Sequence, residues 1–404
     1  MRLLPGLVIA AMIAGGCADG SQRPTLDPTV QEPTSTLGAE APAAASSIVV
    51  DEAPTFDAEE TATFVGRADI NLTGNRVSVG AGDLDGPSID LQLESAAMWI
   101  VPTSNEAGAP WIAALADGTL VSIDLFSSAV VVLDPAWGDA EPAVVSGTIR
   151  RVEPVWDGAA PLPDARLVRD DTMSVMLTDP TDRYAHDVLG DDLEAAAIEV
   201  IGDVATRIEL DGDVVEGRSA LLGDVDGDAT NEILVTQSNA VVGARLVLYG
   251  SDGGQIAASE PIGRGNRWRN QLAIAPVGPN GEVEIIDVRT PHLGRTIEWF
   301  RIEGDQLVRV AARDGFTSHV LGSRNLDLAI VADADSDGLL EVVAPTSDRR
   351  GLSAIARTVD GTTIEFTVEL DAPLSSNVGA VDHPDGGATY AVGTSSGMVR
   401  FWVS

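Results

Sequence analysis

The chain contains no lysine, because all 25 of its basic residues are arginine. That absence excludes Schiff-base chemistry, phosphate binding by a P-loop and any catalytic lysine. The single cysteine excludes an internal disulfide bond, so the fold must depend on its apolar core. No His-Glu-x-x-His motif is present, and aromatic residues make up only 4% of the sequence. No short motif of this kind therefore predicts an enzyme.

Acidic residues dominate the charge, with 62 Asp and Glu against 25 Arg and a formal net charge of −37. Nucleic acids and anionic membrane surfaces would be repelled by so negative a protein. We therefore expect no nucleic-acid partner, and we expect the surface to attract cations.

The N-terminus has the layout of a secretion signal. Met1-Arg2 precedes an apolar run from Leu3 to Ala14, and two glycines lead to Cys17. The run is shorter than the roughly 20 apolar residues needed to cross a bilayer. Ala14-Gly15-Gly16-Cys17 resembles the bacterial lipobox, which implies cleavage before Cys17 and attachment of lipid to its thiol. An ordinary secreted protein with a chance cysteine is the alternative.

Three regions are expected along the chain: a lipoprotein signal peptide (1–16), a lipidated tether (17–60) and a folded domain (61–404). The tether is rich in Pro, Ala, Ser, Thr and acid. Such a composition cannot bury enough apolar surface to order itself, so we predict a flexible, disordered linker. The protein is predicted to be exported and anchored to the outer face of the cell membrane by the lipid on Cys17 alone.

Beyond residue 61 the sequence consists of short apolar runs broken by Gly, Asp and Pro, the pattern of β-strands and turns. The runs are Ala96–Val101, Trp111–Ala116, Ala143–Val145, Ser174–Leu177, Ala197–Ile201, Leu246–Tyr249 and Val283–Val288. Only Asp191–Val200 has a pattern that favours a helix. We predict an all-β domain.

An internal repeat narrows this prediction to a β-propeller. Residues 223–235 match residues 332–344, and weaker copies begin near Pro276 and Asp382. The intervals between equivalent positions are 52, 57 and 49 residues, measured at Asp224, Pro276, Asp333 and Asp382. A period of about 50 residues fits four strands and their loops, which is one propeller blade. The domain has room for six or seven four-stranded blades.

Two copies of the repeat carry the spacing Asp-x-Asp-x-Asp-x-x-x-Glu. A hard cation such as Ca²⁺ takes about six to eight oxygen ligands, and carboxylates at alternate positions of a tight loop point to one centre. A backbone carbonyl at the seventh position and the acid at the ninth complete the set. We therefore predict about two Ca²⁺ sites, with ligands Asp224, Asp226, Asp228, Thr230 and Glu232, and Asp333, Asp335, Asp337, Leu339 and Glu341.

An acidic turn without metal is the alternative interpretation of each loop, because Asp and Gly are common in turns. The four acids would then repel one another with nothing to offset the repulsion. An EF-hand would need Glu at position twelve and flanking helices, and the sequence predicts neither.

The two loops, each followed by an apolar strand, resemble FG-GAP or VCBS-type repeats, the blades of integrin-alpha-like propellers. The resemblance covers mainly residues 210–404. It implies that each loop joins the first two strands of a blade and that positions one, three, five, seven and nine hold Ca²⁺. The Pro276 copy keeps only Asn280 and Glu284, and the Asp382 copy lacks the ninth-position acid. Neither is expected to hold metal well.

Polar residues recur just before the expected inner strands and define a candidate ligand pocket. Because inner strands begin beside the propeller axis, these side chains would form a ring around one mouth of the channel. The candidates are Arg183, His186, Arg269, Asn270, His319, Arg324 and Asn325. An arginine-rich lining would suit an anionic or sugar-like ligand. Hydrogen bonding between blades is the alternative.

These features favour a calcium-binding propeller on the cell surface that binds a protein or carbohydrate ligand. A lyase or hydrolase of extracellular polysaccharide is an alternative, and it would require an axial pocket where Tyr184, His319 and Arg324 converge. A structural spacer tethered by lipid is the third. The fold alone does not choose among them.

We predict that Cys17→Ser abolishes lipidation, because the serine hydroxyl cannot replace the thiol that receives the lipid. The variant should be released from the membrane or should remain uncleaved, which membrane fractionation and mass spectrometry of the N-terminus would detect. A variant that matures normally and stays in the membrane fraction would contradict the lipobox interpretation.

Overall fold

The computed structural model describes residues 73–404 except 146–147, 153, 155 and 185. Within this part of the chain every regular element is a β-strand, and no helix has the length and apolar character needed to span a bilayer. The predicted signal peptide, Cys17 and tether lie outside the described residues.

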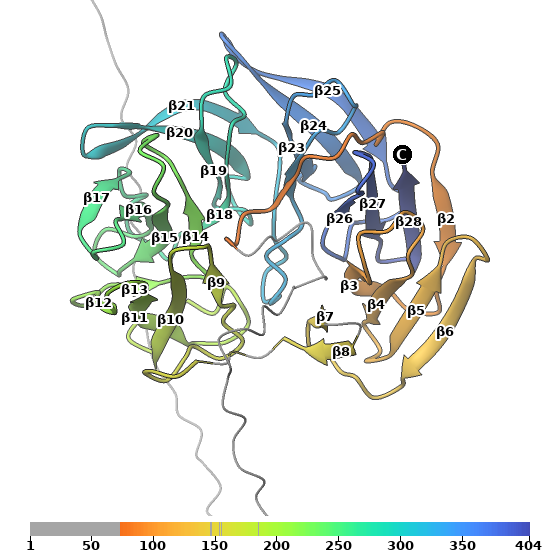
Figure 1. Cartoon of the computed structure of the whole chain (residues 1–404), viewed down its shortest axis with the longest axis horizontal. Coiled ribbons are helices and arrows are strands. Elements are labelled where there is room, and N and C mark those ends of the chain that lie inside the picture. The colour runs from red at the N-terminus through yellow and green to blue at the C-terminus, as the bar shows by residue number, and fades with distance from the viewer. Residues whose placement is uncertain (1–72, 146–147, 153, 155, 185) are drawn as a thin grey trace, which may run out of the picture. The chain divides into compact units, whose positions relative to one another are not determined.

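The strands form antiparallel sheets that follow one another around a common centre, as Figure 1 shows. We number these sheets as blades 1 to 7 in chain order. Blade 1 contains β3 (Ala97–Pro102), β4 (Trp111–Leu115), β5 (Leu120–Asp124) and β6 (Ala129–Asp134). Blade 2 contains β7 (Pro142–Val145) and β8 (Thr148–Arg151). Blade 3 contains β9 (Val168–Arg169), β10 (Ser174–Thr181), β11 (Glu194–Ile201) and β12 (Thr206–Glu209).

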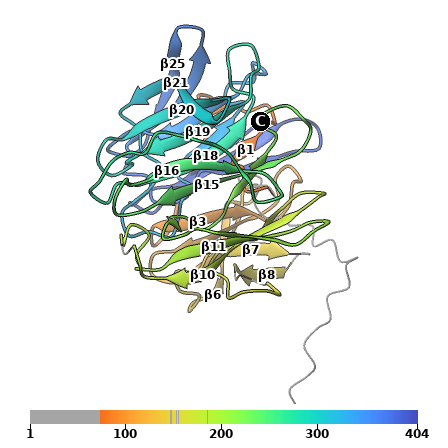
Figure 2. The ribbon, with the colours of Figure 1, turned by 90° about the vertical axis from the view of Figure 1, so that its left-hand side faces the viewer.

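The remaining blades have the same internal order. Blade 4 contains β14 (Leu221–Gly223), β15 (Glu232–Ser238), β16 (Arg245–Tyr249) and β17 (Gln255–Ala258). Blade 5 contains β18 (Arg269–Ala275), β19 (Glu284–Arg289), β20 (Thr296–Glu303) and β21 (Gln306–Asp314). Blade 6 contains β22 (Ile330–Ala332), β23 (Glu341–Pro345), β24 (Gly351–Thr358) and β25 (Gly361–Glu369). In the side view of Figure 2, β15, β16 and β18 run along the direction in which Figure 1 is viewed.

Blade 7 is completed by a strand from the other end of the chain. It contains β26 (Gly379–Asp382), β27 (Ala388–Gly393), β28 (Met398–Val403) and, as its fourth strand, β2 (Ile89–Gln92). β2 pairs antiparallel with β28, and Arg400 forms a bidentate ion pair with Asp90 across this junction. The ring of blades is therefore closed by hydrogen bonds between the first and last parts of the described chain.

This strand order confirms the β-propeller prediction. The five sheets of the described residues divide into six four-stranded blades and one two-stranded blade when β1, β13 and the single parallel bridge between β17 and β21 are treated as links between blades. This number lies within the predicted range of six or seven. β13 (Val214–Val215) pairs with both β11 and β15 and so links blades 3 and 4. All seven predicted strand runs lie on strands.

The helical pattern of Asp191–Val200 proved a wrong prediction, because β11 occupies Glu194–Ile201. β11 lies between β10 and β12 in the sheet, and its residues are buried from Glu194 to Ile198. Tertiary pairing has therefore overridden the helix propensity of the alanines.

Apolar side chains fill the spaces between neighbouring blades. One cluster joins blades 3 and 4, and another joins blades 6 and 7. Strands such as β4 and β15 are buried along their whole length. Burial on both faces explains why these strands have continuous apolar sequences without alternation.

The segment from Thr73 to Gly82 crosses the centre of the propeller, where Figure 1 shows it in orange. The Asn75 side chain donates to the carbonyl of Leu222 in blade 4 and accepts from the amide of Ile274 in blade 5. β1 (Val77–Ser78) then pairs in parallel with β22 of blade 6. This segment therefore occupies the place where an axial pocket was expected.

Buried ion pairs surround this central segment. Arg76 donates to Asp327 at 2.6 Å and to the carbonyls of Gln271 and Leu272. Arg166 contacts Asp327 at 2.7 Å and Glu141 at 3.0 Å. Burial would lower the pKa of Arg166, but the charges of Asp327 and Glu141 raise it above its usual range.

Arg218 extends this central ion-pair network to blade 3. It lies 3.0 Å from Glu141, and its guanidinium donates to the carbonyl of Asp164. The network of Arg76, Arg166, Arg218, Glu141 and Asp327 thus connects the central segment with the entrances of several blades. Its members are almost fully buried.

The outer edge of blade 1 is unusually apolar. β6 has the sequence Ala-Val-Val-Val-Leu-Asp, and its first five residues are exposed. Its neighbour along the ring, blade 2, has two strands among the described residues instead of four. The outer strands of blade 1 therefore lack the cover that a complete neighbouring blade would give.

We predict that Asp327→Asn lowers the free energy of unfolding by about 3–5 kcal/mol, because it removes the carboxylate shared by two buried arginines. Urea denaturation would measure the loss. Asp90→Asn is the control, since it breaks an ion pair with Arg400 that is partly exposed and should cost about 1 kcal/mol or less. Equal losses for the two variants would contradict a dominant role of the central ion-pair network.

Candidate metal centre

Each acidic loop joins the first two strands of a blade. Residues 224–231 connect β14 to β15 in blade 4, and residues 333–340 connect β22 to β23 in blade 6. The weaker copies occupy the same place between β18 and β19 and between β26 and β27. The sequence repeat therefore corresponds to one structural position in four consecutive blades.

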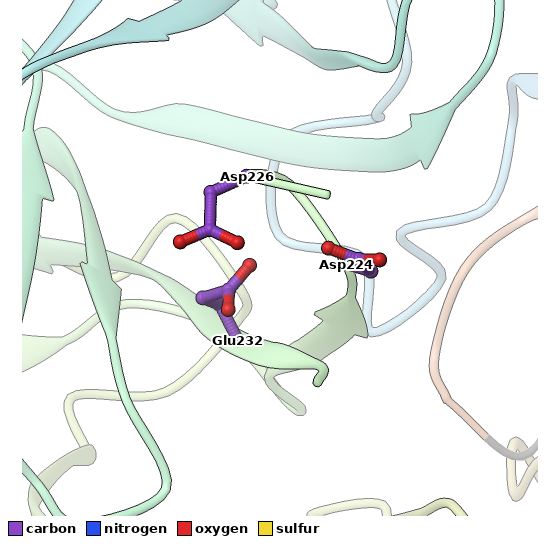
Figure 3. A group of neighbouring side chains, drawn as sticks. All are labelled: Asp224, Asp226 and Glu232. Carbon is purple, nitrogen blue, oxygen red and sulfur yellow. The ribbon is translucent and has the colours of Figure 1, made fainter. Parts of the chain in front are cut away.

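In blade 4 the loop brings three carboxylates together. One oxygen each from Asp224, Asp226 and Glu232 lies within 4.8 Å of the others, and Figure 3 shows the three side chains around one space. The amide of Val225 donates to Oε2 of Glu232 at 2.7 Å and fixes this side chain at the start of β15.

In blade 6 the same three positions meet. Oxygens of Asp333, Asp335 and Glu341 also lie within 4.8 Å of one another. The amide of Ala334 donates to Oε2 of Glu341 at 3.0 Å, which matches the contact of Val225 in the other loop. Two loops with different neighbours have therefore adopted the same arrangement.

The blade 6 loop also contains acceptors without donors. Oδ1 of Asp333 and Oε1 of Glu341 are buried and have no hydrogen-bond partner among the described residues. Burial raises the pKa of Glu341 to about 8, the amide of Ala334 opposes this, and nearby carboxylates raise it further. Buried carboxylates that lack a partner are costly. An oxygen-seeking cation would relieve both the repulsion and the unmet acceptors, so this donor set fits Ca²⁺.

The fifth- and seventh-position residues are placed differently from the other predicted ligands. Oδ1 of Asp228 accepts from the amide of Thr230, and Oδ1 of Asp337 accepts from the amide of Leu339. Asp228 and Asp337 lie outside the two groups of converging carboxylates. Their side chains shape the turn that carries the seventh-position carbonyl.

In blades 5 and 7 protein groups satisfy the equivalent acids. Glu284, the ninth-position acid of blade 5, is fully buried and pairs with Arg301 and Arg357. Asp382, the first-position acid of blade 7, accepts from the amides of Val79 and Gly80 in the central segment. These positions therefore link parts of the fold through direct contacts.

Most of the candidate pocket residues are buried and paired. Arg269 donates to Asp287 and Glu298, and the Asn270 side chain donates to Ser318 and to the carbonyl of Leu326. The Asn325 side chain donates to the carbonyl of Met98, and its oxygen accepts from the amide of Asp327. The contacts of Asn270 and Asn325 leave their own blades, as expected of packing between blades. Both partners of Arg269 lie within blade 5.

Arg324 and Arg183 are more accessible. Arg324 is half-buried and pairs with Asp164 and, at 2.9 Å, with Asp191. Arg183 is exposed. The hydroxyl of Tyr184 is buried and has no hydrogen-bond partner among the described residues.

Two of the predicted histidines lie in a cluster that the sequence did not reveal. His319 is buried, with Nδ1 2.8 Å from Nε2 of His292 and Nε2 2.7 Å from the carbonyl of Ser323. Burial lowers the pKa of His319 to about 3. Nδ1 of His186 lies 2.5 Å from Glu216, whose carbonyl accepts from the indole of Trp268.

The sequence also did not reveal the residues of the central ion-pair network. Arg166, Arg218 and Asp327 each lie two or three residues before the first strand of a blade, at Val168, Leu221 and Ile330. Their position shortly before a first strand could have identified them, because the other polar candidates lie at the same place relative to their strands. These three residues are more than fifty positions apart in the sequence, so the sequence gives no sign that they pair.

Comparisons with known proteins add little to this geometry. No family model matches the chain. Over 153 residues, 38% of the chain, it is 31% identical to filamentous hemagglutinin of Bordetella pertussis, and it spans only 4% of that protein's length.

Two solved structures are similar at low sequence identity. BamB from Moraxella catarrhalis has a TM-score of 0.37 and 12% identity, over 79% of this chain and 99% of that one. The β-propeller domain of Cps50 (Swd1) from Myceliophteria thermophila has a TM-score of 0.41 and 13% identity, over 79% and 98% of the two chains. The fold assignment rests on the strand order described above.

The two loops differ in where they place glycine. Both turn through left-handed backbone at positions four and six. In blade 4 these are Gly227 (φ 83°) and Ala229 (φ 69°), whereas in blade 6 they are Ser336 (φ 65°) and Gly338 (φ 85°). A side chain in this region is strained by about 1–2 kcal/mol. Each loop therefore contains one strained residue.

We predict that Ala229→Gly stabilises the protein in the presence of Ca²⁺ by about 1 kcal/mol, because relief of strain exceeds the entropy gained by the unfolded chain. The reverse change at the matched position, Gly338→Ala, should destabilise by a similar amount. No atom lies within 4 Å of a Cβ added there, so strain alone is tested. Chemical denaturation of both variants would check the pair, and stabilisation by the alanine would contradict the prediction.

Proposed function

We propose that this protein is a calcium-stabilised β-propeller lipoprotein that acts outside the membrane as a ligand-binding or interaction module. The matched pair of loops carries the proposal, because each brings the first-, third- and ninth-position acids together. The proposal includes lipidation of Cys17 and assignment of blades 4 and 6 to the FG-GAP or VCBS repeat type.

The calcium part of the proposal assigns a defined task to each loop. Asp224, Asp226 and Glu232 would hold one ion, and the equivalent acids of blade 6 would hold the other. Bound Ca²⁺ would neutralise the crowded carboxylates and draw their oxygens into one coordination shell. The chain would gain a fixed connection between the first and second strands of each blade.

The blade 6 loop would also secure the closure of the ring. Gly82 and Leu84 donate their amides to the carbonyls of Asp333 and Ala334, and the Ser336 hydroxyl donates back to Gly82. The phenol of Tyr390 in blade 7 donates to the Asp333 carbonyl at 3.1 Å. An ordered blade 6 loop would therefore hold the central segment and blade 7 together.

The exposed strand β6 supports the interaction part of the proposal. Val131 and Val132 are each more than half exposed, and Phe126 beside them is 85% exposed. β6 pairs only with β5 among the described residues. Contiguous apolar surface on a soluble protein commonly marks an interaction site, and an edge strand offers free backbone groups to a partner.

The enzymatic alternative has no specific observation in its favour among the described residues. The centre of the propeller holds the segment from Thr73 to Gly82 and the central ion-pair network. Tyr184 and Arg324 both lie within electrostatic reach of Glu194. Arg324, however, is held by Asp164 and Asp191. His319 is held by His292 and the carbonyl of Ser323. We therefore do not propose a lyase or hydrolase, and nothing specific favours a spacer over a binding module.

We predict that EDTA lowers the melting temperature and that added Ca²⁺ restores it. A ligand that binds only the folded state stabilises it by RT ln(1 + [L]/Kd), or about 2.7 kcal/mol at 100 times Kd. Asp335→Ala should reduce bound calcium from about two ions to one, as measured by elemental analysis of the dialysed protein.

Asp385→Ala is the matched control for this experiment, because Asp385 lies in the equivalent loop of blade 7, which lacks the full motif. It should leave both ions bound. If neither EDTA nor Ca²⁺ changes the melting temperature and the purified protein contains no calcium, the calcium proposal is refuted.

A further inference from the structure

We infer that a cavity formed by blade 5 and the connection between β17 and β18 binds a small ring-bearing carboxylate. This inference rests on the proposed ligand-binding role but does not involve the acidic loops. The cavity has a volume of about 560 Å³ and lies where the chain passes from β17 to β18. Ligand pockets of a few hundred Å³ hold molecules of one or two rings.

Three arginines from different strands of blade 5 line this cavity. They are Arg269 on β18, Arg289 on β19 and Arg309 on β21. Arg269 and Arg289 stand directly opposite each other in the antiparallel pair of strands. Like charges in such a cross-strand pair repel, so this arrangement needs negative charge nearby.

The protein supplies only part of that charge. Arg269 lies 2.7 Å from Asp287 and 2.8 Å from Glu298, and Glu298 is shared with Arg309. Arg289 forms no ion pair with another described residue, although its charge acts on Asp287. Burial raises the pKa of Asp287 to about 6, an effect that the charges of Arg269 and Arg289 oppose. Three guanidinium groups therefore face two carboxylates, while Glu260 lies at the exposed rim.

Unused hydrogen-bond donors give a second, independent indication of a ligand. The Nε–H groups of both Arg269 and Arg289 are buried and have no acceptor among the described residues, and Oδ1 of Asp287 is likewise unpaired. Arg269 as a whole is only 5% exposed. The edge formed by Nε and Nη2 is the part of a guanidinium that grips a carboxylate with two parallel hydrogen bonds. An external carboxylate would supply the missing acceptors.

The other walls define the rest of the ligand. Ile262, Phe300 and Leu307 line the same cavity, and Arg269 lies over the Phe300 ring at 5.5 Å. An apolar wall beside a cationic one suits a flat, compact ring that carries one negative group. A free carboxylic acid and an acidic sugar share this chemistry, so the test must separate them.

Calorimetric titration of the calcium-loaded protein would test the inference with benzoate and glucuronate. Binding of either supports it, and the preferred probe identifies the ring. Benzamide, which has the shape of benzoate without its charge, should not bind measurably. Arg289→Gln should weaken binding about tenfold or more, because it removes a charged hydrogen-bond donor whose loss breaks no ion pair within the described protein.

Arg313→Gln is the matched control, because Arg313 lies on β21 with Arg309 but does not line the cavity. It should bind like the unmodified protein. Asp335→Ala should also retain carboxylate binding, so failure at the acidic loops and failure at this cavity are distinguishable. The inference is overturned if neither carboxylate binds, if benzamide binds as well as benzoate, or if Arg289→Gln leaves the affinity unchanged.

Discussion

Asp327 and the two arginines that share it hold the centre of this propeller. A ring of blades leaves its innermost strands facing one another, and their ends carry polar backbone that must be satisfied away from water. Here Arg76 bonds to Asp327 and to two blade 5 carbonyls, while Arg166 brings Glu141 of the blade 2 region into the same cluster. Buried charges are tolerated only when they are paired. A charged residue just before one blade therefore requires its partner from another blade to lie within contact distance, which constrains how the blades are placed. The closed ring depends on this mutual constraint.

The repeated loop position shows how one local sequence pattern is used in two ways. In blade 5, Glu284 meets Arg301 and Arg357, so its charge is balanced by the chain itself. In blade 6, Glu341 occupies the same position, and within the described part of the chain it has no basic partner and retains a buried oxygen without a donor. The difference lies in the surrounding arginines and not in the loop alone. An external cation is therefore proposed only where the protein supplies no internal one.

Periodicity in the sequence predicted the blades because each blade repeats the same strand and turn chemistry about every 50 residues. It also located the loops that gather Asp224, Asp226 and Glu232, since those acids are close in sequence. The network of Arg76, Arg166 and Asp327 could not be predicted in this way, because its members lie in distant segments and meet only when the ring closes. For the same reason, the closing strand β2 and the opposed pair of Arg269 and Arg289 required the three-dimensional arrangement. Local patterns specify elements, whereas long-range pairs depend on topology.

The centre of the propeller is filled, so a ligand would bind away from the axis. The segment from Thr73 to Gly82 satisfies inner-strand groups of blades 4 to 7, so little binding capacity remains at the axis. At the cavity beside blade 5, by contrast, the Nε donors of Arg269 and Arg289 are buried and have no acceptor among the described residues. The chain has a net charge of −37, so these arginines form a local concentration of positive charge within a negative overall field. An anion in the cavity would lie within contact distance of these arginines and much farther from most surface acids. Because the Coulomb energy falls with distance, selectivity for anions can arise locally against the sign of the overall field.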